Sequence, residues 1–336
     1  MKNFRLLAII VLLVLFVLVI PILFRNDNYI LHVFIMASEI SIVALTVRLM
    51  YITGEFTFGQ VAFVMFGAYS SALLATKAGV PFWVALPMAG ILSALFALVI
   101  GFPVLRLKGT YFAILTLIIA EVMCQAARVW DFVGGDTGLE NLPRPDAIHI
   151  GTFTLIPEFT AIDKLPYYYL IAFLLILTIV VFRRIDRSPL GATFRAIQQN
   201  DTLAASIGIN VRWHRILVFS ISAFFCGLVG SFYAHYMTVF YPRSFSVWDS
   251  ITYVLYAFLG GIGYLGGPIL GSFGMIWLWE FMHPIQKFQP MIFAGAIVMV
   301  ILFLPGGLFS LEKFLPSVAA QIGKLSGPLG KKLRRN

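Results

Sequence analysis

Charged residues are scarce in this sequence. Asp, Glu, Lys and Arg together make up 12% of its 336 residues, whereas soluble domains carry about 25%. Hydrophobic residues make up 60%, and the mean hydropathy is +0.93. A chain with so little charge is too apolar for a soluble surface, and the sequence therefore predicts an all-α polytopic membrane protein.

Cysteine is almost absent, and so are the motifs of the large enzyme classes. Cys124 and Cys226 both lie in apolar runs and form no CxxC pair, which indicates neither a disulfide framework nor a zinc site. The chain has no phosphate loop, no HExxH, no G-x-S-x-G and no dinucleotide fingerprint. It also lacks the arginine pattern of voltage sensors and a TVGYG filter. We expect no catalysis, metal or cofactor in this chain, so uphill transport would need ion coupling or a partner that hydrolyses ATP.

Long apolar runs dominate what is present. A helix needs about 20 apolar residues to cross a hydrocarbon core of roughly 30 Å. By this measure there are ten candidate spans, and the eighth and ninth are short and interrupted by glycine, so eight crossings plus re-entrant pieces is an open alternative. The first run follows Lys2 and Arg5 but lacks a signal-type cleavage site, and we interpret it as a retained span. The candidates are 6–24, 29–50, 57–76, 82–104, 110–130, 166–182, 216–236, 248–262, 267–282 and 288–305.

The charges between the spans predict an orientation. The 131–165 loop contains six acids against two basic residues and is expected outside, whereas the basic 183–215 interval and the basic tail 313–336 are expected in the cytoplasm. Both termini are then cytoplasmic. The net charge of +9 is explained by lipid headgroups and orientation, without nucleic acid. Within the outer loop, the alternation from Ile148 to Ile156 predicts a small hairpin.

The 183–215 interval is also predicted to be structured. Six arginines there face only Asp186 and Asp201. Pro189 can open a helix, and Asn200 or Asp201 can cap a second one, from Thr202 to Ile207, with Gly208 suited to a left-handed C-terminal position. Two short helices of this kind form a candidate docking surface for a soluble partner, and a basic helix lying on anionic lipid is the alternative.

Polar and glycine-rich segments interrupt the apolar pattern at Gly54–Gln60, Pro81, Gly260–Gly271 and the LPGGL stretch at Pro305. Broken helices near the membrane midplane present backbone dipoles to polar substrates in transporters. The alternative is an ordinary turn, and Gly263-x-x-x-Gly267 and Gly267-x-x-x-Gly271 also permit close helix packing.

Four ionisable side chains fall inside predicted spans. Glu121 should face the bundle interior, because a carboxylate at the centre of a span costs about 2.5–3.5 kcal/mol. For Glu39, as for Glu121, the alternatives are contact with the solute and a hydrogen bond that fixes helix packing. For Arg48 and His235 we favour an interfacial position in which the polar end reaches toward water.

Several blocks together resemble the permease subunit of branched-chain amino acid ABC importers, the LivM type. They are GEFTFGQVAFVMFGAYSSALL (54–74), GFPVLRLKGTYFAILTLIIAEV (101–122), GGDTGL (134–139), the 188–234 block, GGIGYLGGPILGS (260–272) and LPGGL. The resemblance covers nearly the whole chain. This sequence departs from the family at Thr57-Phe58-Gly59, where Ser-Leu-Gly is usual, and at Gln60, where His is common.

The resemblance implies a multi-pass protein of the bacterial plasma (inner) membrane that works with other subunits. Those would be a second homologous permease, two cytoplasmic ATPase subunits and a periplasmic or lipid-anchored solute-binding protein. The candidate solute path comprises Glu39, Thr57, Phe58, Gly59, Gln60 and Glu121. The ATPase-coupling helix would comprise Thr202, Leu203, Ala204, Ala205, Ser206, Ile207 and Gly208.

The leading hypothesis is import of branched-chain or related small amino acids, powered by ATP hydrolysed on the partner subunits. One rival keeps the fold and changes the cargo to urea, short amides or another amino acid. The other is a secondary transporter driven by an ion gradient through Glu39 or Glu121.

Overall fold

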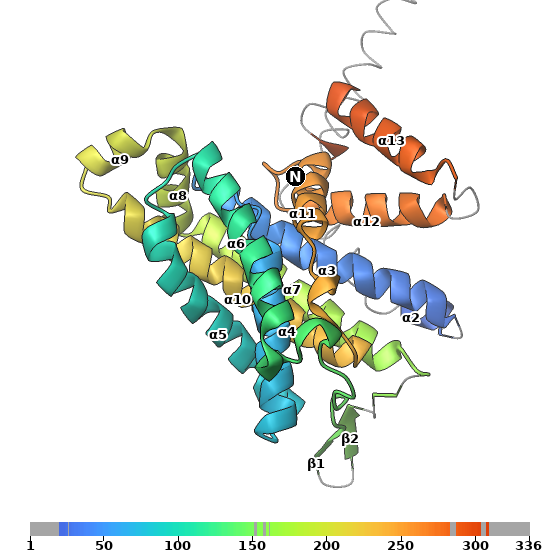
Figure 1. The fold of residues 1–336 in the computed structure, drawn as a ribbon. Helices are drawn as coiled ribbons and strands as arrows, with labels where there is room; N and C mark the ends of the chain where they lie inside the picture. The colour runs from blue at the N-terminus through green and yellow to red at the C-terminus, as the bar shows by residue number, and fades with distance from the viewer. Residues whose placement is uncertain are drawn as a thin grey trace, which may run out of the picture.

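The computed structural model describes residues 20–25, 27–150, 153–156, 159–160, 162–282, 287–303 and 307–308. Most of the predicted first span, 6–24, and the predicted basic tail, 313–336, lie outside these residues. The described chain is helical apart from one small hairpin (Figure 1), which confirms the predicted all-α membrane class.

The helices follow the predicted apolar runs closely. Five of them, α3, α5, α6, α7 and α10, are long and apolar enough to cross a membrane. The α-helices are α2 (Ile20–Leu23), α3 (Asn28–Tyr51), α4 (Gln60–Lys77), α5 (Phe82–Val104), α6 (Thr110–Val129), α7 (Leu165–Arg187), α8 (Pro189–Gln199), α9 (Asp201–Ser206), α10 (Val211–Met237), α11 (Val247–Gly260), α12 (Gly267–Phe281) and α13 (Gln289–Phe303). Short 3-10 turns cover Asp131–Val133, Gly135–Thr137 and Pro242–Ser244.

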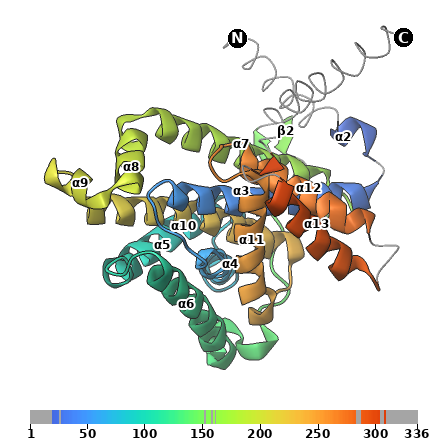
Figure 2. The ribbon, with the colours of Figure 1, turned by 90° about the horizontal axis from the view of Figure 1, so that it is seen from above.

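Helices α3 and α10 form the centre of the bundle. Helix α10 packs on α3, α4 and α5, and α3 also packs on α7, α11 and α12. The α4–α10 contact is close enough to require glycine, because a Cβ atom on Gly230 would overlap the Val64 carbonyl oxygen. Figure 2 shows α3, α10 and α4 surrounded by α5, α7 and α11.

The glycine-rich stretch after α11 is a tight turn with close helix packing. A Cβ atom on Gly271 would overlap the Tyr256 carbonyl oxygen, and one on Gly267 would overlap that of Gly261. Gly263 instead faces open space. The packing interpretation of 260–271 is therefore correct for Gly267 and Gly271, and Gly263 plays no part in it.

The two polar loops lie at opposite ends of the bundle (Figure 1). Helices α8 and α9 project from one end, and strands β1 (Ile148–Ile150) and β2 (Phe153–Ile156) lie at the other. The strands pair antiparallel, which confirms the predicted hairpin. The 23 residues of α7 join the two ends and rise about 34 Å, enough to cross a hydrocarbon core.

Asp136 fixes the 131–165 loop to the bundle. Its carboxylate accepts hydrogen bonds from Arg128 Nε (2.8 Å) and Arg243 Nη2 (3.2 Å), and a backbone bridge joins Leu139 to Phe240. These contacts tie the end of α6 to the segment between α10 and α11. The hydrogen bond from Arg128 is the main reason that the pKa of Asp136 is lowered.

Candidate solute path and coupling site

The segment between α3 and α4 is an extended break in the helical pattern. Residues 55–59 are non-helical, and Thr57, Gly59 and Gln60 are buried. The Thr57 hydroxyl accepts the Gly59 N–H (3.1 Å), and the Phe58 N–H donates to Thr116 Oγ1 of α6 (3.1 Å). Protein groups therefore replace the lost helical partners of this backbone, as buried irregular backbone requires.

Gln60 begins α4 with its side chain buried between α3 and α10. Its Oε1 accepts the Cys226 thiol (3.2 Å), which in turn lies 3.3 Å from Thr46 Oγ1. The other end of the amide, Nε2, is buried and has no hydrogen-bond partner. A buried amide donor without a partner is costly, so this group is suited to meet a polar solute.

Glu39 is buried near the middle of α3. Its Oε1 also has no hydrogen-bond partner. Glu39 lies two helical turns, about 10 Å, from Thr46, which shares Cys226 with Gln60. No described hydrogen bond joins Glu39 to the 57–60 segment, so the two candidate contacts are at different levels of α3.

The prediction that Glu121 faces the bundle interior is wrong for this chain. The side chain lies exposed on the outer surface of α6, where its carboxylate accepts a hydrogen bond from Gln125 Nε2 (2.6 Å). Glu121 shares its helix face with Gln125 and Arg128, and in a membrane such a polar face can be directed either into the bundle or away from it. The candidate path residues therefore do not converge on one site, because Glu121 lies apart from the buried Glu39 and Gln60.

Two other ionisable groups also differ from expectation. Arg48 is buried and donates to Asp186 Oδ2 (2.7 Å), and His235 is buried between Ser71 Oγ (3.0 Å from Nε2) and the Pro143 carbonyl oxygen (2.7 Å from Nδ1). Both side chains are enclosed by other parts of the protein. For both, the interpretation as a hydrogen bond that fixes packing is the correct one.

The 183–215 interval forms the predicted pair of helices. Ser188 caps α8, whose Phe194 and Ile197 are buried, and Pro189 is its first residue. Asn200 Oδ1 accepts the N–H groups of Thr202 (3.1 Å) and Leu203 (3.0 Å), so Asn200 is the cap of α9 and the helix starts at Asp201. Gly208 has the expected positive φ of 89°.

Helix α9 has one inward side chain and an exposed apolar pair. Ala204 is 3% exposed, whereas Leu203 is 64% and Ile207 is 72% exposed. Leu203 and Ile207 are four residues apart and so share one face of the helix. Thr202, Ala205, Ser206 and Gly208 are also exposed, so of the seven predicted coupling residues only Ala204 is buried against the protein.

A four-membered charge network joins α9 to the broken segment. Arg215 Nη2 lies 3.0 Å from Glu55 Oε1 and 3.7 Å from Asp201 Oδ2, and Lys108 Nζ donates to Asp201 Oδ2. Glu55 Oε2 also accepts the Gly109 N–H (3.1 Å). The network holds two acids and two bases and connects the α3–α4 segment, the α5–α6 loop, α9 and α10.

Opposing effects act on the carboxylates of this network. Burial raises the pKa of Glu55, and Arg215 and the Gly109 N–H partly offset this rise. The hydrogen bond from Lys108 lowers the pKa of Asp201. Asp201 is therefore stabilised as the anion, whereas the charge of Glu55 depends on Arg215.

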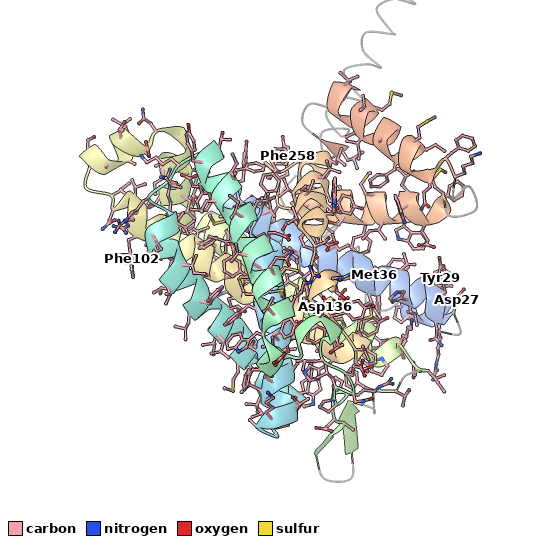
Figure 3. The ribbon with its side chains drawn as sticks, in the orientation of Figure 1. Asp27, Tyr29, Met36, Phe102, Asp136 and Phe258 are labelled. Carbon is pink, nitrogen blue, oxygen red and sulfur yellow. The ribbon has the colours of Figure 1, made fainter. Side chains whose placement is uncertain are left out.

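Three further hydrogen bonds lie at the same end of the bundle as the charge network. Gln198 Nε2 of α8 donates to the Tyr51 carbonyl oxygen at the end of α3 (2.9 Å), and Arg195 Nη2 donates to that of Asp186 (3.0 Å). Arg212 donates to the Phe102 carbonyl oxygen (2.7 Å) and stacks on its ring; Figure 3 shows Phe102 beside this end of the bundle. These contacts tie α8 to the ends of α3 and α7, and the start of α10 to α5.

The comparison with known families decides the identity of this chain. Residues 29–304 match the family model described as branched-chain amino acid transport system / permease component. The chain belongs to this permease family. The high-affinity branched-chain amino acid transport system permease proteins LivM of Escherichia coli (strain K12) and Salmonella typhimurium (strain LT2) are each 28% identical to it over 291 residues, which cover 82% of this chain and 68% of each relative. No solved structure matches.

The match confirms the resemblance drawn from the sequence blocks, and it identifies the chain as a multi-pass transport permease rather than an enzyme. Sequence reasoning missed the role of Glu55 in this permease. The available signal was the excess of arginines over acids in the 183–215 interval, which predicts that some arginines find acidic partners elsewhere in the chain. In the structure, its two acids, Asp186 and Asp201, contact the buried arginines Arg48 and Arg215. Glu55 is the remaining acid near that end of the bundle, and Arg215 takes it as a second partner.

Proposed function

We propose that this permease is the membrane subunit of an ATP-binding-cassette importer in the bacterial plasma membrane. It would carry branched-chain or related small amino acids into the cytoplasm, using ATP hydrolysed by two partner subunits and solute delivered by a binding protein. Membership of the permease family carries the proposal. The arrangement around α9 supports it.

Helix α9 has the features of an ATPase-docking element. It is a single short helix that projects from one end of the bundle (Figure 1), and it presents Leu203 and Ile207 to the outside. Two neighbouring exposed aliphatic side chains on a projecting helix suit insertion into an apolar groove of a partner. The buried Ala204, next to this pair on the helix, seats α9 on the permease.

The charge network supplies the connection from docking to the solute path. A displacement of α9 moves Asp201, and Arg215 links Asp201 to Glu55. Glu55 is two residues before Thr57 in the extended segment that leads to Gln60. The Arg215–Glu55 pair is buried and resists separation, because breaking it leaves a desolvated charge, so a shift of Arg215 that follows Asp201 is transmitted to this segment.

The exposed position of Glu121 supports a second permease as the neighbour of α6. In the apolar central stretch of α5 and of α6, only 33% of the residues are buried. The corresponding share in α3 and α10 is 72%. A carboxylate facing lipid is costly, so polar groups in a membrane face protein or a water-filled path. We infer that the second permease covers the face of α6 that carries Glu121 and Gln125.

Reconstituted vesicles test the proposed function. We expect leucine uptake by the permease and its partner subunits to require ATP and binding protein, and urea in excess to leave uptake unchanged. Replacement of Leu203 and Ile207 by Asp should abolish uptake and ATPase co-purification, whereas Leu190→Asp should retain both, because Leu190 is an exposed leucine on α8 outside the α9 face. Uptake driven by a proton or sodium gradient without the ATPase subunits would contradict the proposal.

A further inference from the structure

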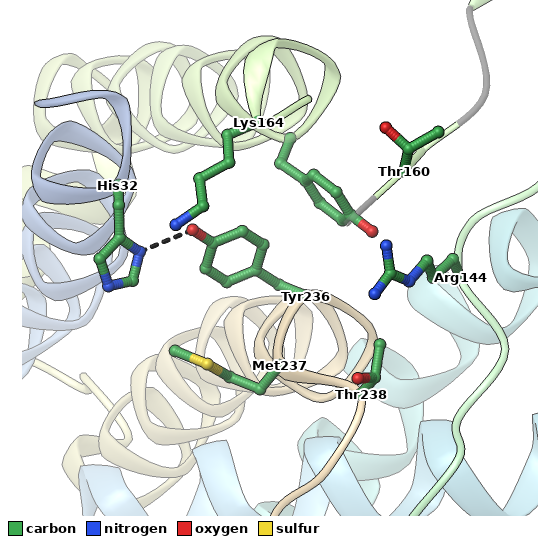
Figure 4. Close-up of a pocket in the computed structure, with 8 residues that line it drawn as sticks. His32, Arg144, Thr160, Lys164, Tyr236, Met237 and Thr238 are labelled. Carbon is green, nitrogen blue, oxygen red and sulfur yellow. Dashed lines mark hydrogen bonds between the residues drawn. The ribbon is translucent and has the colours of Figure 1, made fainter. Parts of the chain in front are cut away.

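A small cavity lies at the end of the bundle that carries the β1–β2 hairpin (Figure 4). Its volume is about 150 Å³, and it forms where the start of α7 and the end of α10 meet α3. It lies apart from the residues proposed for solute translocation and ATPase coupling. The lining residues are His32, Arg144, Thr160, Lys164, Tyr167, Tyr236, Met237 and Thr238.

The charges of this cavity are all positive. Arg144 and Lys164 both line it, and no Asp or Glu is present among its described lining residues. Neither cation belongs to an ion pair with a described acid. The neighbouring Asp163 is directed elsewhere, because its Oδ1 accepts the Leu165 N–H (2.9 Å) at the start of α7.

Burial without a counter-charge affects Lys164 directly. Desolvation lowers the pKa of this ammonium group, and no acid among the described residues offsets the effect. An anion entering the cavity would supply that missing partner. The helix dipoles do not change this conclusion, since the positive end of α7 and the negative end of α10 both lie here and oppose each other.

The polar uncharged groups around the cations are arranged as hydrogen-bonding partners. His32 Nδ1 lies 2.6 Å from the Tyr236 hydroxyl, and Lys164 Nζ lies 5.9 Å from the centroid of the Tyr236 ring. Figure 4 shows the end of Lys164 beside the Tyr236 hydroxyl and the Arg144 guanidinium on the other side of the Tyr236 ring, away from His32.

We propose that this cavity is an anion-binding site for a ligand with a carboxylate or phosphate group, with Arg144 and Lys164 as its cationic side chains. Arg offers a planar fork that binds either group through two N–H donors, and Lys adds a point charge. The volume is below the roughly 300–1,000 Å³ of drug-sized pockets, which suits a single anionic group with a short attached chain. The two sources of such a group are the carboxylate of a free amino acid and the phosphate of an anionic lipid.

Binding to the full chain in lipid nanodiscs tests the proposal and distinguishes the sources. In phosphatidylcholine discs, L-leucine is titrated by calorimetry beside 3-methylbutylamine, which lacks the carboxylate. In a second arm, native mass spectrometry measures retention of phosphatidylglycerol against phosphatidylcholine. We expect the carboxylate or the phosphate ligand to bind, and Arg144→Gln and Lys164→Gln each to weaken that ligand at least tenfold.

Controls separate a lost site from a misfolded chain. Lys77→Gln should change nothing, because Lys77 is a cation at the same end of the bundle that contacts Phe132 and does not line the cavity. Arg144→Lys keeps the charge and should restore most of the binding. The proposal is overturned if neither ligand binds, or if binding is equal in wild type, Arg144→Gln and Lys164→Gln. Loss of ATP-driven uptake alone would count against the transport proposal and not against this site.

Discussion

Arg215 and Glu55 form an ion pair with 3.0 Å between Nη2 and Oε1, and their side chains are only 7% and 1% exposed. The pair joins the second turn of α10 to the extended segment before α4. Asp201 of α9 shares the same guanidinium at 3.7 Å. A single buried arginine therefore links α9 to the start of the candidate solute path.

The two partners of this pair should differ in how much stability they contribute. Arg215→Met should lower the free energy of unfolding by about 3–5 kcal/mol, because it leaves a buried carboxylate without its counter-ion. Glu55→Gln should cost about 1 kcal/mol, because Arg215 retains Asp201 and the amide can still accept the Gly109 N–H. Thermal unfolding of the purified permease in detergent measures both. Equal losses from the two variants would show that the pair does not act in this asymmetric way.

The free energy of unfolding of Arg215→Met should also depend more strongly on pH than that of the wild-type protein. Burial raises the pKa of Glu55 above its ordinary 4.5, and Arg215 is the strongest group that opposes the rise. Because the pKa of Glu55 is raised in the folded state, the stability that Glu55 contributes is fully present below about pH 4.5. That contribution is lost as the pH rises through the folded-state pKa. Without Arg215 this loss should be larger than in wild type. Lys108 and Asp201, the other charges of the network, are unchanged in the comparison.

The double variant Glu55→Gln/Arg215→Met is the control for this titration. It has no buried carboxylate at position 55, so the additional loss of stability with rising pH should disappear. If the double variant titrates as Arg215→Met does, another group is responsible.

Close packing of α4 on α10 predicts opposite effects of alanine at two helical glycines. Gly230→Ala should destabilise the permease by about 1–3 kcal/mol, because the added methyl group overlaps the Val64 carbonyl oxygen and forces the helices apart. Gly295→Ala in α13 meets no atom within 4 Å and should be neutral or stabilising by up to about 1 kcal/mol. Unfolding temperatures of both variants, measured side by side, decide the matter, and a stable Gly230→Ala protein would contradict the close approach.

The exposed face of α6 should lie against the second permease. A cysteine at Glu121, in a chain lacking Cys124 and Cys226 and labelled with benzophenone maleimide, should photo-cross-link to the partner permease in membranes. The same label on a cysteine at Val99, which is exposed on α5 among apolar side chains, should not. Gel electrophoresis after irradiation shows the product, and cross-linking from position 99 alone would place the interface on α5.

Local patterns predicted more of this permease than tertiary contacts did. The pair α8–α9 followed from Pro189, Asn200 and Gly208, because capping and C-terminal glycine depend on neighbours within a few residues. The hairpin near Ile148 followed from alternation and a central glycine. In each case the determining interactions are close in sequence.

The orientation of isolated polar residues could not be predicted in the same way. Glu121 was expected inside and lies outside, whereas Arg48 and His235 were expected at an interface and are buried. Helix α6 carries Glu121, Gln125 and Arg128 at spacings of four and three, so these polar residues share one face. In a membrane helix such a face can be directed inward or outward, so the pattern does not determine the rotation. The partners of Arg48 and His235 lie on other helices, and contacts of that kind depend on how the bundle assembles.

The short helices at the glycine turn have a consequence for depth in the membrane. Helix α11 has 14 residues and α12 has 15, so each rises only about 21–23 Å, less than the roughly 30 Å thickness of hydrocarbon. Neither helix alone can cross that thickness, so backbone amides in the turn between them need partners that lipid does not offer. Protein supplies them, because the N–H groups of Gly261, Tyr264 and Gly267 donate to the carbonyl oxygens of Phe258, Gly261 and Tyr264.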